Sequence, residues 1–158
     1  LLAGLDEPYG ILAKEELGKI PLLNRWMKLL GCVFVQRDDV RASVRALNDA
    51  TAIVESGRSF IIFPEGTRNK GEELSLLPFH NGSFKIAEKT GCPIIPMSLN
   101  NTCDIFEGHF PFIKKTHVIL EYGKPIYPKE LDKDEKKRIG EYCSNIISET
   151  IHKNQALV

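Results

Sequence analysis

Several features are scarce in this sequence of 158 residues, and each shortage excludes a class of protein. Four cysteines are present, but no two have Cys-x-x-Cys spacing and none clusters with the four histidines. The sequence therefore predicts neither a zinc knuckle nor a disulfide framework, and it fits a reducing compartment that faces the cytoplasm. No internal repeat or low-complexity linker is visible.

The sequence also lacks an excess of charge of either sign. Lysine and arginine number 21, and aspartate and glutamate also number 21, so no global field attracts nucleic acid. Any binding of anions must come from local placement of cations. No partner nucleic acid is expected.

Long apolar runs are missing as well. None approaches the roughly 20 residues that a membrane-spanning helix needs, so the chain as given is not expected to cross a bilayer. The opening residues Leu1 to Leu5 lack the basic region of a signal peptide, and they begin inside an apolar stretch without Met or a helix cap. We expect a single domain over residues 1–158 that lacks its N-terminal part.

The residues that are present alternate between strand and helix patterns. With 42% hydrophobic and 27% charged residues the chain can bury a core. Strands and helices in alternation predict an α/β fold, in which a layered, mostly parallel or mixed sheet is flanked by helices. The expected strands are Gly10–Ala13, Cys32–Val35, Ser59–Phe63, Pro93–Leu99 and His117–Tyr122, and the expected helices run from Pro21 to Leu30, from Asp38 or Asp39 to Gly57, around Phe84–Lys89, and through Ile139–Ile151.

Ligands of such sheets bind beyond the carboxyl ends of the strands. Polar groups stand at three of these ends: Lys14, Arg37 and the segment from Glu65 to Arg68. The last segment offers a glycine for close backbone approach, a hydroxyl, and a guanidinium suited to phosphate. The alternative is a surface ion pair between Glu65 and Arg68 in a turn.

A nucleotide P-loop is a competing interpretation, because Gly66 and Gly71 have its glycine spacing. However, Glu72 and Glu73 replace the lysine and the hydroxyl residue of that motif. Two carboxylates would repel the phosphates of a nucleotide. We reject the P-loop.

Five blocks of the sequence, in order, resemble the glycerolipid acyltransferases, and within them the 1-acyl-glycerol-3-phosphate (lysophosphatidate) acyltransferases. The segment Phe-Pro-Glu-Gly-Thr-Arg at 63–68 is similar to the signature block of that family. The other four blocks are Leu12–Leu17, Gly31–Arg37, Pro78–Phe84 and Cys92–Met97. Beyond Leu99 only the rhythm of strands and helices matches.

This resemblance implies a glycerol-3-phosphate acyltransferase-like fold and a role in phospholipid biosynthesis. The implied reaction moves an acyl group from acyl-CoA or acyl carrier protein to the free sn-2 hydroxyl of lysophosphatidate, giving phosphatidate. Another glycerol-phosphate or lysophospholipid acceptor, or a non-catalytic lipid-binding homologue, are the alternatives. Apart from the acyl donor, no cofactor or metal is expected.

The family uses a His-x-x-x-x-Asp block, in which the histidine is the general base and the aspartate orients it. No histidine of this chain has an aspartate at that spacing, and the resemblance places the block before Leu1. This chain is therefore expected to lack a catalytic residue and to be inactive alone. His80 is interpreted as a surface or rim residue.

The resemblance also assigns the binding residues. Lys14 and Arg68 match the positions that hold the acceptor's phosphate, and Arg37 matches a third basic position. Solvated or locally paired cations are the alternative, but three cations at strand ends suit a doubly charged phosphate. Gly66 and Thr67 would donate to the phosphate, and Glu65 would bond Arg68 or the acceptor's glycerol hydroxyls.

Lipid substrates imply contact with a membrane, on its cytoplasmic face, either peripherally or through an anchor in a missing N-terminal segment. The helix at Pro21–Leu30 carries a stripe of Leu22, Leu23, Trp26, Met27 and Leu30. We expect this stripe to pack in the core, with headgroup contact as the alternative. The other candidate surface is the aromatic cluster Phe106, Phe110 and Phe112, followed by Lys114 and Lys115.

Overall fold

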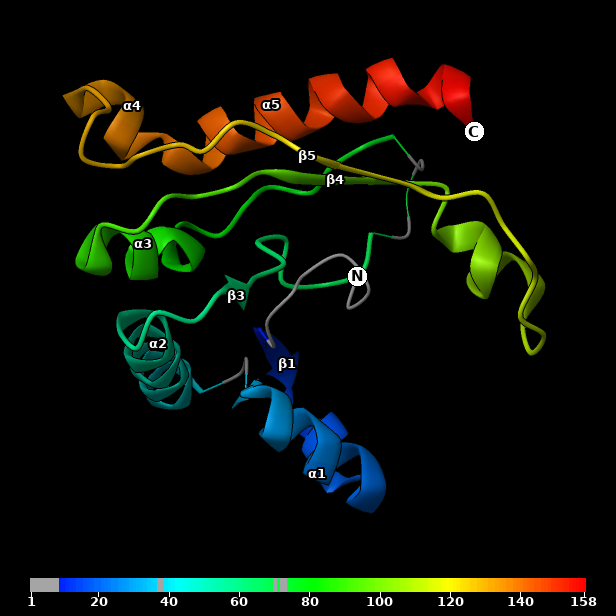
Figure 1. Ribbon diagram of the computed structural model, residues 1–158, viewed down its shortest axis with the longest axis horizontal. Helices are drawn as coiled ribbons and strands as arrows, with labels where there is room; N and C mark the ends of the chain where they lie inside the picture. The colour runs from blue at the N-terminus through cyan, green and yellow to red at the C-terminus, as the bar shows by residue number, and fades with distance from the viewer. Residues whose placement is uncertain (1–8, 37–38, 70, 72–73) are drawn as a thin grey trace. The chain divides into compact units, whose positions relative to one another are not determined.

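The computed structural model describes residues 9–36, 39–69, 71 and 74–158 (Figure 1). The chain divides into two compact units. The first unit comprises Leu1–Phe63 and Ser83–Cys92, and the second comprises Pro64–Gly82 and Pro93–Val158. The single domain expected from the sequence stays a prediction.

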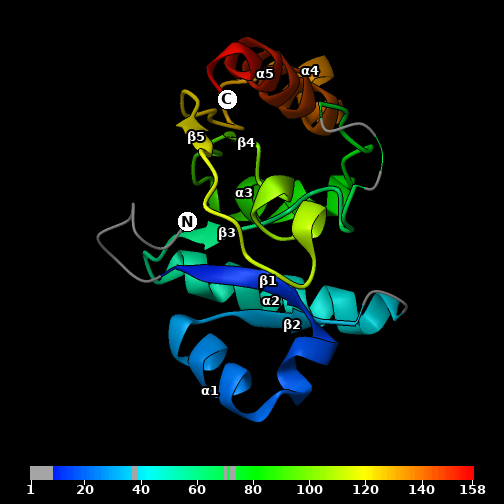
Figure 2. The ribbon, with the colours of Figure 1, turned by 90° about the vertical axis from the view of Figure 1, so that its right-hand side faces the viewer.

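The first unit contains a parallel sheet of three strands in the order β2-β1-β3 (Figure 2). Gly10 lets β1 pass close to the segment just before β2, because a Cβ atom there would lie 2.4 Å from the carbonyl oxygen of Gly31. In the register, Lys14 lies opposite Val35, so the carboxyl ends of β1 and β2 share one edge. The bounds are β1 Gly10–Lys14, β2 Val33–Val35 and β3 Phe60–Ile61.

The helices of the first unit begin and end where the sequence predicts. Pro21 occupies the first turn of α1, and Gly31 ends it with a φ of 80°. The Asp39 carboxylate caps α2 by accepting from the backbone N–H of Arg41 at 2.7 Å. The bounds are η2 Glu15–Lys19, α1 Pro21–Leu30, α2 Val40–Glu55 and α3 Lys85–Thr90, preceded by η3 Asn81–Phe84 at the junction with the second unit.

The core of this unit forms between the sheet, α2 and α3. Burying such aliphatic side chains stabilises a fold by about 1.5–3 kcal/mol each. Helix α1 contributes no buried residue, so the expected core packing of its stripe is wrong. The buried members of the core are Val33, Val35, Ala46, Ala50 and Ile86.

The second unit pairs two antiparallel strands with a long helix, and α5 lies along β4 (Figure 1). The Asn100 side-chain amide donates to the Ile151 carbonyl at 2.8 Å and joins β4 to α5. An unpredicted short helix, α4, begins with an Asp132–Glu135 capping box. The bounds are β4 Met97–Asn100, η4 Cys103–Ile105, η5 Glu107–His109, β5 Ile119–Tyr122, α4 Lys133–Lys137, α5 Ile139–Asn154 and η6 Gln155–Leu157.

Four of the five strands are shorter than the sequence predicts, and proline shortens two of them. The apolar run at Ser59–Phe63 pairs only at Phe60–Ile61, because Pro64 follows it and β1 is its sole partner among the described residues. The run at Pro93–Leu99 is divided by Pro96, so Ile94 makes only an isolated bridge to Ile126 before β4 begins. The α/β class itself is confirmed.

Candidate functional site

Lys14, the first predicted phosphate ligand, ends β1 and is exposed to solvent. Its Nζ lies 2.7 Å from Oε1 of Glu16, two residues along the chain. The hydrogen bond from Lys14 is the main cause that lowers the pKa of the Glu16 carboxyl below its ordinary value. Each side chain of this pair is 56% exposed, so an incoming phosphate can replace Glu16 as the partner of the ammonium group.

Arg37, the second predicted cation, lies outside the described residues. The strand that leads to it, β2, ends at Val35 opposite Lys14. Of these two cations, the register of the sheet therefore places only Lys14 at the carboxyl end of its strand.

The other four predicted residues form one loop of the second unit, and two hydrogen bonds close it. The backbone N–H of His80 donates to the Pro64 carbonyl at 2.9 Å. The backbone N–H of Leu77 donates to Oε2 of Glu65, also at 2.9 Å. These two hydrogen bonds hold Pro64 and Glu65, which directly precede Gly66–Arg68. The conformation of that segment is therefore fixed where it begins.

Gly66 is required at its position for two reasons. Its φ of 68° lies in the left-handed region, which side chains rarely adopt. A Cβ atom there would also lie 2.9 Å from Cδ2 of the His80 ring. A glycine here lets the backbone turn beneath the imidazole.

Arg68 presents an accessible guanidinium. Its side chain is 84% exposed, and Nη1 lies 3.7 Å from Oε1 of Glu107. Such an exposed pair contributes little to stability. Among the described residues, Arg68 therefore pairs with Glu107 and Glu65 with Leu77, so the expected bond between Glu65 and Arg68 is not formed.

The structure brings Glu65, Gly66, Thr67 and Arg68 together and places Lys14 in the other unit. The convergence of the cations on one phosphate stays a prediction. His80 is exposed, as expected for a rim residue, but its contact with Gly66 was missed. Gly66 and His80 are not related by a helical or strand period. The only indication of their contact in the sequence is that their two blocks, 63–68 and 78–84, follow one another closely.

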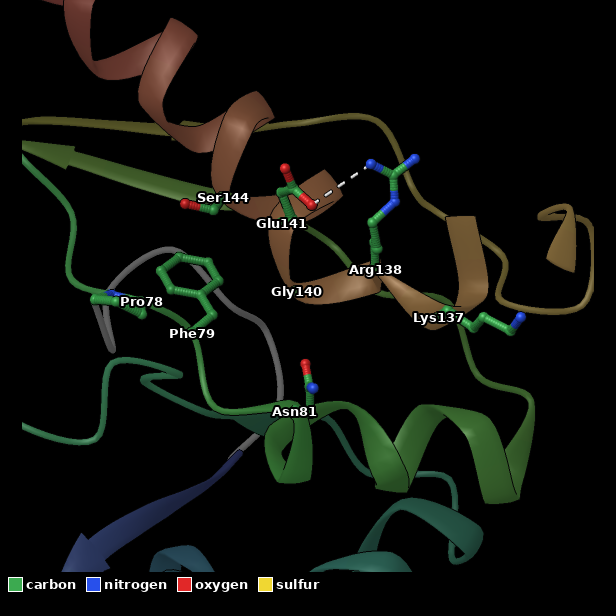
Figure 3. Close-up of a pocket in the computed structure, with 8 residues that line it drawn as sticks. All are labelled: Pro78, Phe79, Asn81, Lys137, Arg138, Gly140, Glu141 and Ser144. Atoms are coloured by element: carbon green, nitrogen blue, oxygen red, sulfur yellow. Dashed lines mark ion pairs between the residues drawn. The ribbon is translucent and has the colours of Figure 1, made fainter. Parts of the chain in front are cut away.

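A separate pocket of about 360 Å³ lies in the second unit (Figure 3). Phe79 lines it from the loop and Asn81 from the start of η3, while α5 lines its other side. Figure 3 shows the Lys137 side chain pointing away from Phe79. The lining also contains the ion pair of Arg138 with Glu141, and none of the predicted phosphate ligands takes part.

Among the described residues, no group of three or more His, Cys, Asp and Glu side chains is placed to hold a metal ion. No helix in the described part of the chain is both long and apolar enough to traverse a bilayer.

The sequence of this chain matches that of known acyltransferases. A model of the family described as acyltransferase matches residues 1–100. The 1-acyl-sn-glycerol-3-phosphate acyltransferase of Borreliella burgdorferi is 36% identical over 132 residues, which are 84% of this chain and 52% of that protein. The protein of the same name from Helicobacter pylori is 40% identical over 80% of this chain and 56% of its own length.

The fold gives the same result. The crystal structure of the 1-acyl-sn-glycerophosphate (LPA) acyltransferase PlsC from Thermotoga maritima superposes with a TM-score of 0.81 at 33% identity, covering 99% of this chain and 61% of that one. The chain belongs to the acyltransferase family. It spans about half the length of the relatives from B. burgdorferi and H. pylori. The resemblance drawn from the five sequence blocks is thus confirmed.

Proposed function

We propose that the whole protein acylates the sn-2 hydroxyl of 1-acyl-glycerol-3-phosphate and produces phosphatidate for phospholipid biosynthesis. The observation that carries this proposal is the braced loop at 64–68, where Gly66 gives access to the backbone and Arg68 presents a guanidinium that is 84% exposed. A guanidinium fork binds phosphate through two parallel hydrogen bonds. The names of the relatives support the same acceptor.

In this reaction the acceptor's hydroxyl oxygen attacks the carbonyl carbon of a thioester, carried by coenzyme A or acyl carrier protein. The C–S bond breaks, the hydroxyl proton passes to a general base, and the thiol leaves with a proton. The residues of this chain bind and orient the acceptor. The chain alone is expected to show no turnover, because loss of a general base costs roughly 100- to 10,000-fold in rate.

Two alternatives remain within the same family. A different glycerol-phosphate or lysophospholipid acceptor would use the same phosphate contacts. A non-catalytic lipid-binding homologue would bind the acceptor without transfer. Acceptor competition with the whole protein, combined with a binding measurement, separates them, because the first changes the preferred acceptor and the second gives binding without product.

We further propose that the protein works on the cytoplasmic face of a membrane. Both the acceptor and the product are lipids, so the enzyme must reach a bilayer surface. The cysteine spacing of the sequence, without any Cys-x-x-Cys pair, fits a reducing compartment.

Arg68→Ala in the whole protein tests the acceptor assignment. The variant loses a charged contact to the phosphate, so the KM for lysophosphatidate should rise roughly 10- to 100-fold, while the KM for the acyl donor stays unchanged. Arg138→Ala is a matched control, because Arg138 is also exposed and forms a comparable pair with Glu141 at 3.9 Å. Equal kinetics for the two variants would contradict the role of Arg68.

A further inference from the structure

Most of the exposed large apolar side chains described in the first unit lie on η2 and α1 and at their junction. None of the α1 side chains is buried, although the helix is rich in leucine. We call this surface the apolar patch. It consists of Leu17 (39% exposed), Ile20 (49%), Leu22 (75%), Leu23 (38%), Trp26 (64%) and Leu29 (72%).

The helix carries more apolar surface than its own unit covers. Leu22, Trp26 and Leu29 stand four and three residues apart, so they share one face of α1. Met27 and Leu30 lie on a neighbouring face and are half-buried. The exposed face is thus separate from the half-buried one, and an exposed cluster of this kind marks an interaction surface.

The charges within the apolar patch are positive, although two carboxylates, Glu15 and Glu16, begin η2 directly before it. The cations Lys19, Arg25 and Lys28 lie among its members. All three side chains are exposed. A short helix with leucine and tryptophan on one face and cations beside them suits the headgroup layer of an anionic bilayer.

We infer that the apolar patch is a docking surface for a bilayer that contains anionic lipid. Helix α1 lies in the plane of the interface, with Leu22, Trp26 and Leu29 inserted among the acyl chains. Lys14, which directly precedes η2, then stands near the headgroups, where the phosphate of a lipid acceptor is found. The assignment rests on the proposed function only through that last step.

Trp26 reports on this docking directly, because it is the only tryptophan of the chain. Addition of vesicles made of phosphatidylcholine and phosphatidylglycerol should shift its emission to shorter wavelength. Acyl chains that carry bromine should quench it. Vesicles of phosphatidylcholine alone should give a weaker response at equal lipid concentration, because they lack the anionic headgroups.

Two variants test the two components of the surface. Leu22→Ser with Leu29→Ser removes the inserting side chains and keeps Trp26 as the reporter, so vesicle binding should be lost. Arg25→Gln with Lys28→Gln should weaken binding to the anionic vesicles by about fivefold for each charge removed. The same pair should leave binding to phosphatidylcholine alone unchanged.

Val40→Ser with Val44→Ser is the matched control, because both valines are exposed in the same unit, at 79% and 52%, outside the patch. This variant should bind vesicles like the original chain. Its thermal unfolding, together with that of the leucine variant, verifies that both remain folded.

Three outcomes would overturn the inference. Vesicle binding that survives the leucine variant but is lost with Phe110→Ser and Phe112→Ser would assign docking to the aromatic segment instead. Emission that shifts with protein concentration in the absence of lipid would indicate a second copy of the chain as the occupant. An unquenched Trp26 with brominated lipid would exclude insertion. If turnover of dispersed acceptor by the whole protein persisted in any of these cases, the proposed function would stand.

Discussion

Glu65 lies at the start of the loop at 64–68, which we call the phosphate loop because we propose that it binds the acceptor's phosphate. Its carboxylate faces the backbone of the same loop. Oε2 accepts the N–H of Leu77 at 2.9 Å, and the bond is partly buried. An acidic residue would repel a bound phosphate if it were free, whereas here the hydrogen bond engages it with the loop. We therefore expect Glu65 to position Gly66–Arg68.

Substitution of Glu65 should separate positioning from charge. Glu65→Ala leaves the Leu77 N–H without its partner, which costs about 1–3 kcal/mol and loosens the loop, so the acceptor KM of the whole protein should rise. Glu65→Gln keeps an oxygen that can accept the same N–H and should retain most of the affinity. Equal damage from both variants would instead favour a contact between the carboxylate and the acceptor's hydroxyls.

Gly66 offers a second test at the residue scale. Gly66→Ala places a side chain in the left-handed region, at a cost of about 1–2 kcal/mol, and also presses a methyl group against His80. The loss in free energy of unfolding can be measured by chemical denaturation. Adding His80→Ala should recover only part of the loss, because the backbone strain remains. Full recovery would show that the contact with His80 is the whole effect.

At the scale of elements, Glu121 of β5 joins the end of α5 to the antiparallel pair. It accepts from Asn154 Nδ2 at 2.7 Å and from Lys153 Nζ at 3.2 Å. The hydrogen bond from Asn154, followed by that from Lys153, lowers the pKa of the Glu121 carboxyl below its ordinary value of 4.5. Asn154 is almost fully buried, so this contact anchors the helix end.

A carboxyl pKa that is lowered in the folded state makes the stability of the fold depend on pH in one direction. The stabilisation is complete above the unfolded-state pKa and is lost as the pH falls through the lower pKa of the folded state. The Tm of the chain should therefore fall on acidification below about pH 4.5, the ordinary carboxyl value. Glu121→Gln should have a lower Tm at neutral pH, and its Tm should fall less steeply with pH in the acidic range. If the Tm of the variant fell as steeply with pH as that of the original chain, the assignment to Glu121 would be contradicted.

Helix ends were easier to predict than strand lengths, and the reason is physical. Pro21, Gly31 and Asp39 act within one turn, so a short stretch of sequence contains their whole effect. A strand depends on a partner elsewhere in the chain, and Pro64 and Pro96 interrupt pairing that the apolar runs alone predict. The capping box of α4 was readable as Asp132 followed three residues later by Glu135, but the segment lacks an apolar stripe.

For the whole molecule, the sequence predicted the class of fold and the family, whereas phosphate binding by the phosphate loop stays a prediction. The sequence did not predict the contacts that shape that loop. Leu77 lies 12 residues from Glu65, and Glu107 lies further along the chain from Arg68. Neither pair follows a helical or strand period, so only the folded chain reveals them. The sequence favoured core packing for the apolar stripe of α1, which proved wrong. An apolar helical pattern is the same whether the helix packs in the core of its own domain or presents the stripe to another surface.

The balance of charges makes a final prediction about ligand binding. With 21 residues of each sign the chain has no general attraction for anions, so binding of lysophosphatidate requires the local cations. A short-chain lysophosphatidate, kept monomeric, should therefore raise the Tm of this chain without being consumed. At about 100 times its Kd the ligand adds roughly 2.7 kcal/mol to the free energy of unfolding.

Scanning calorimetry with variants locates that binding. Arg138→Ala should show the same rise in Tm as the original chain, because its side chain lies outside the phosphate loop. Arg68→Ala should show a much smaller rise, since the bidentate contact to the phosphate is gone. Glycerol without the phosphate should give no rise in any of the three. An undiminished rise in Arg68→Ala would mean that the phosphate binds elsewhere on the chain, and the role of the loop would have to be abandoned.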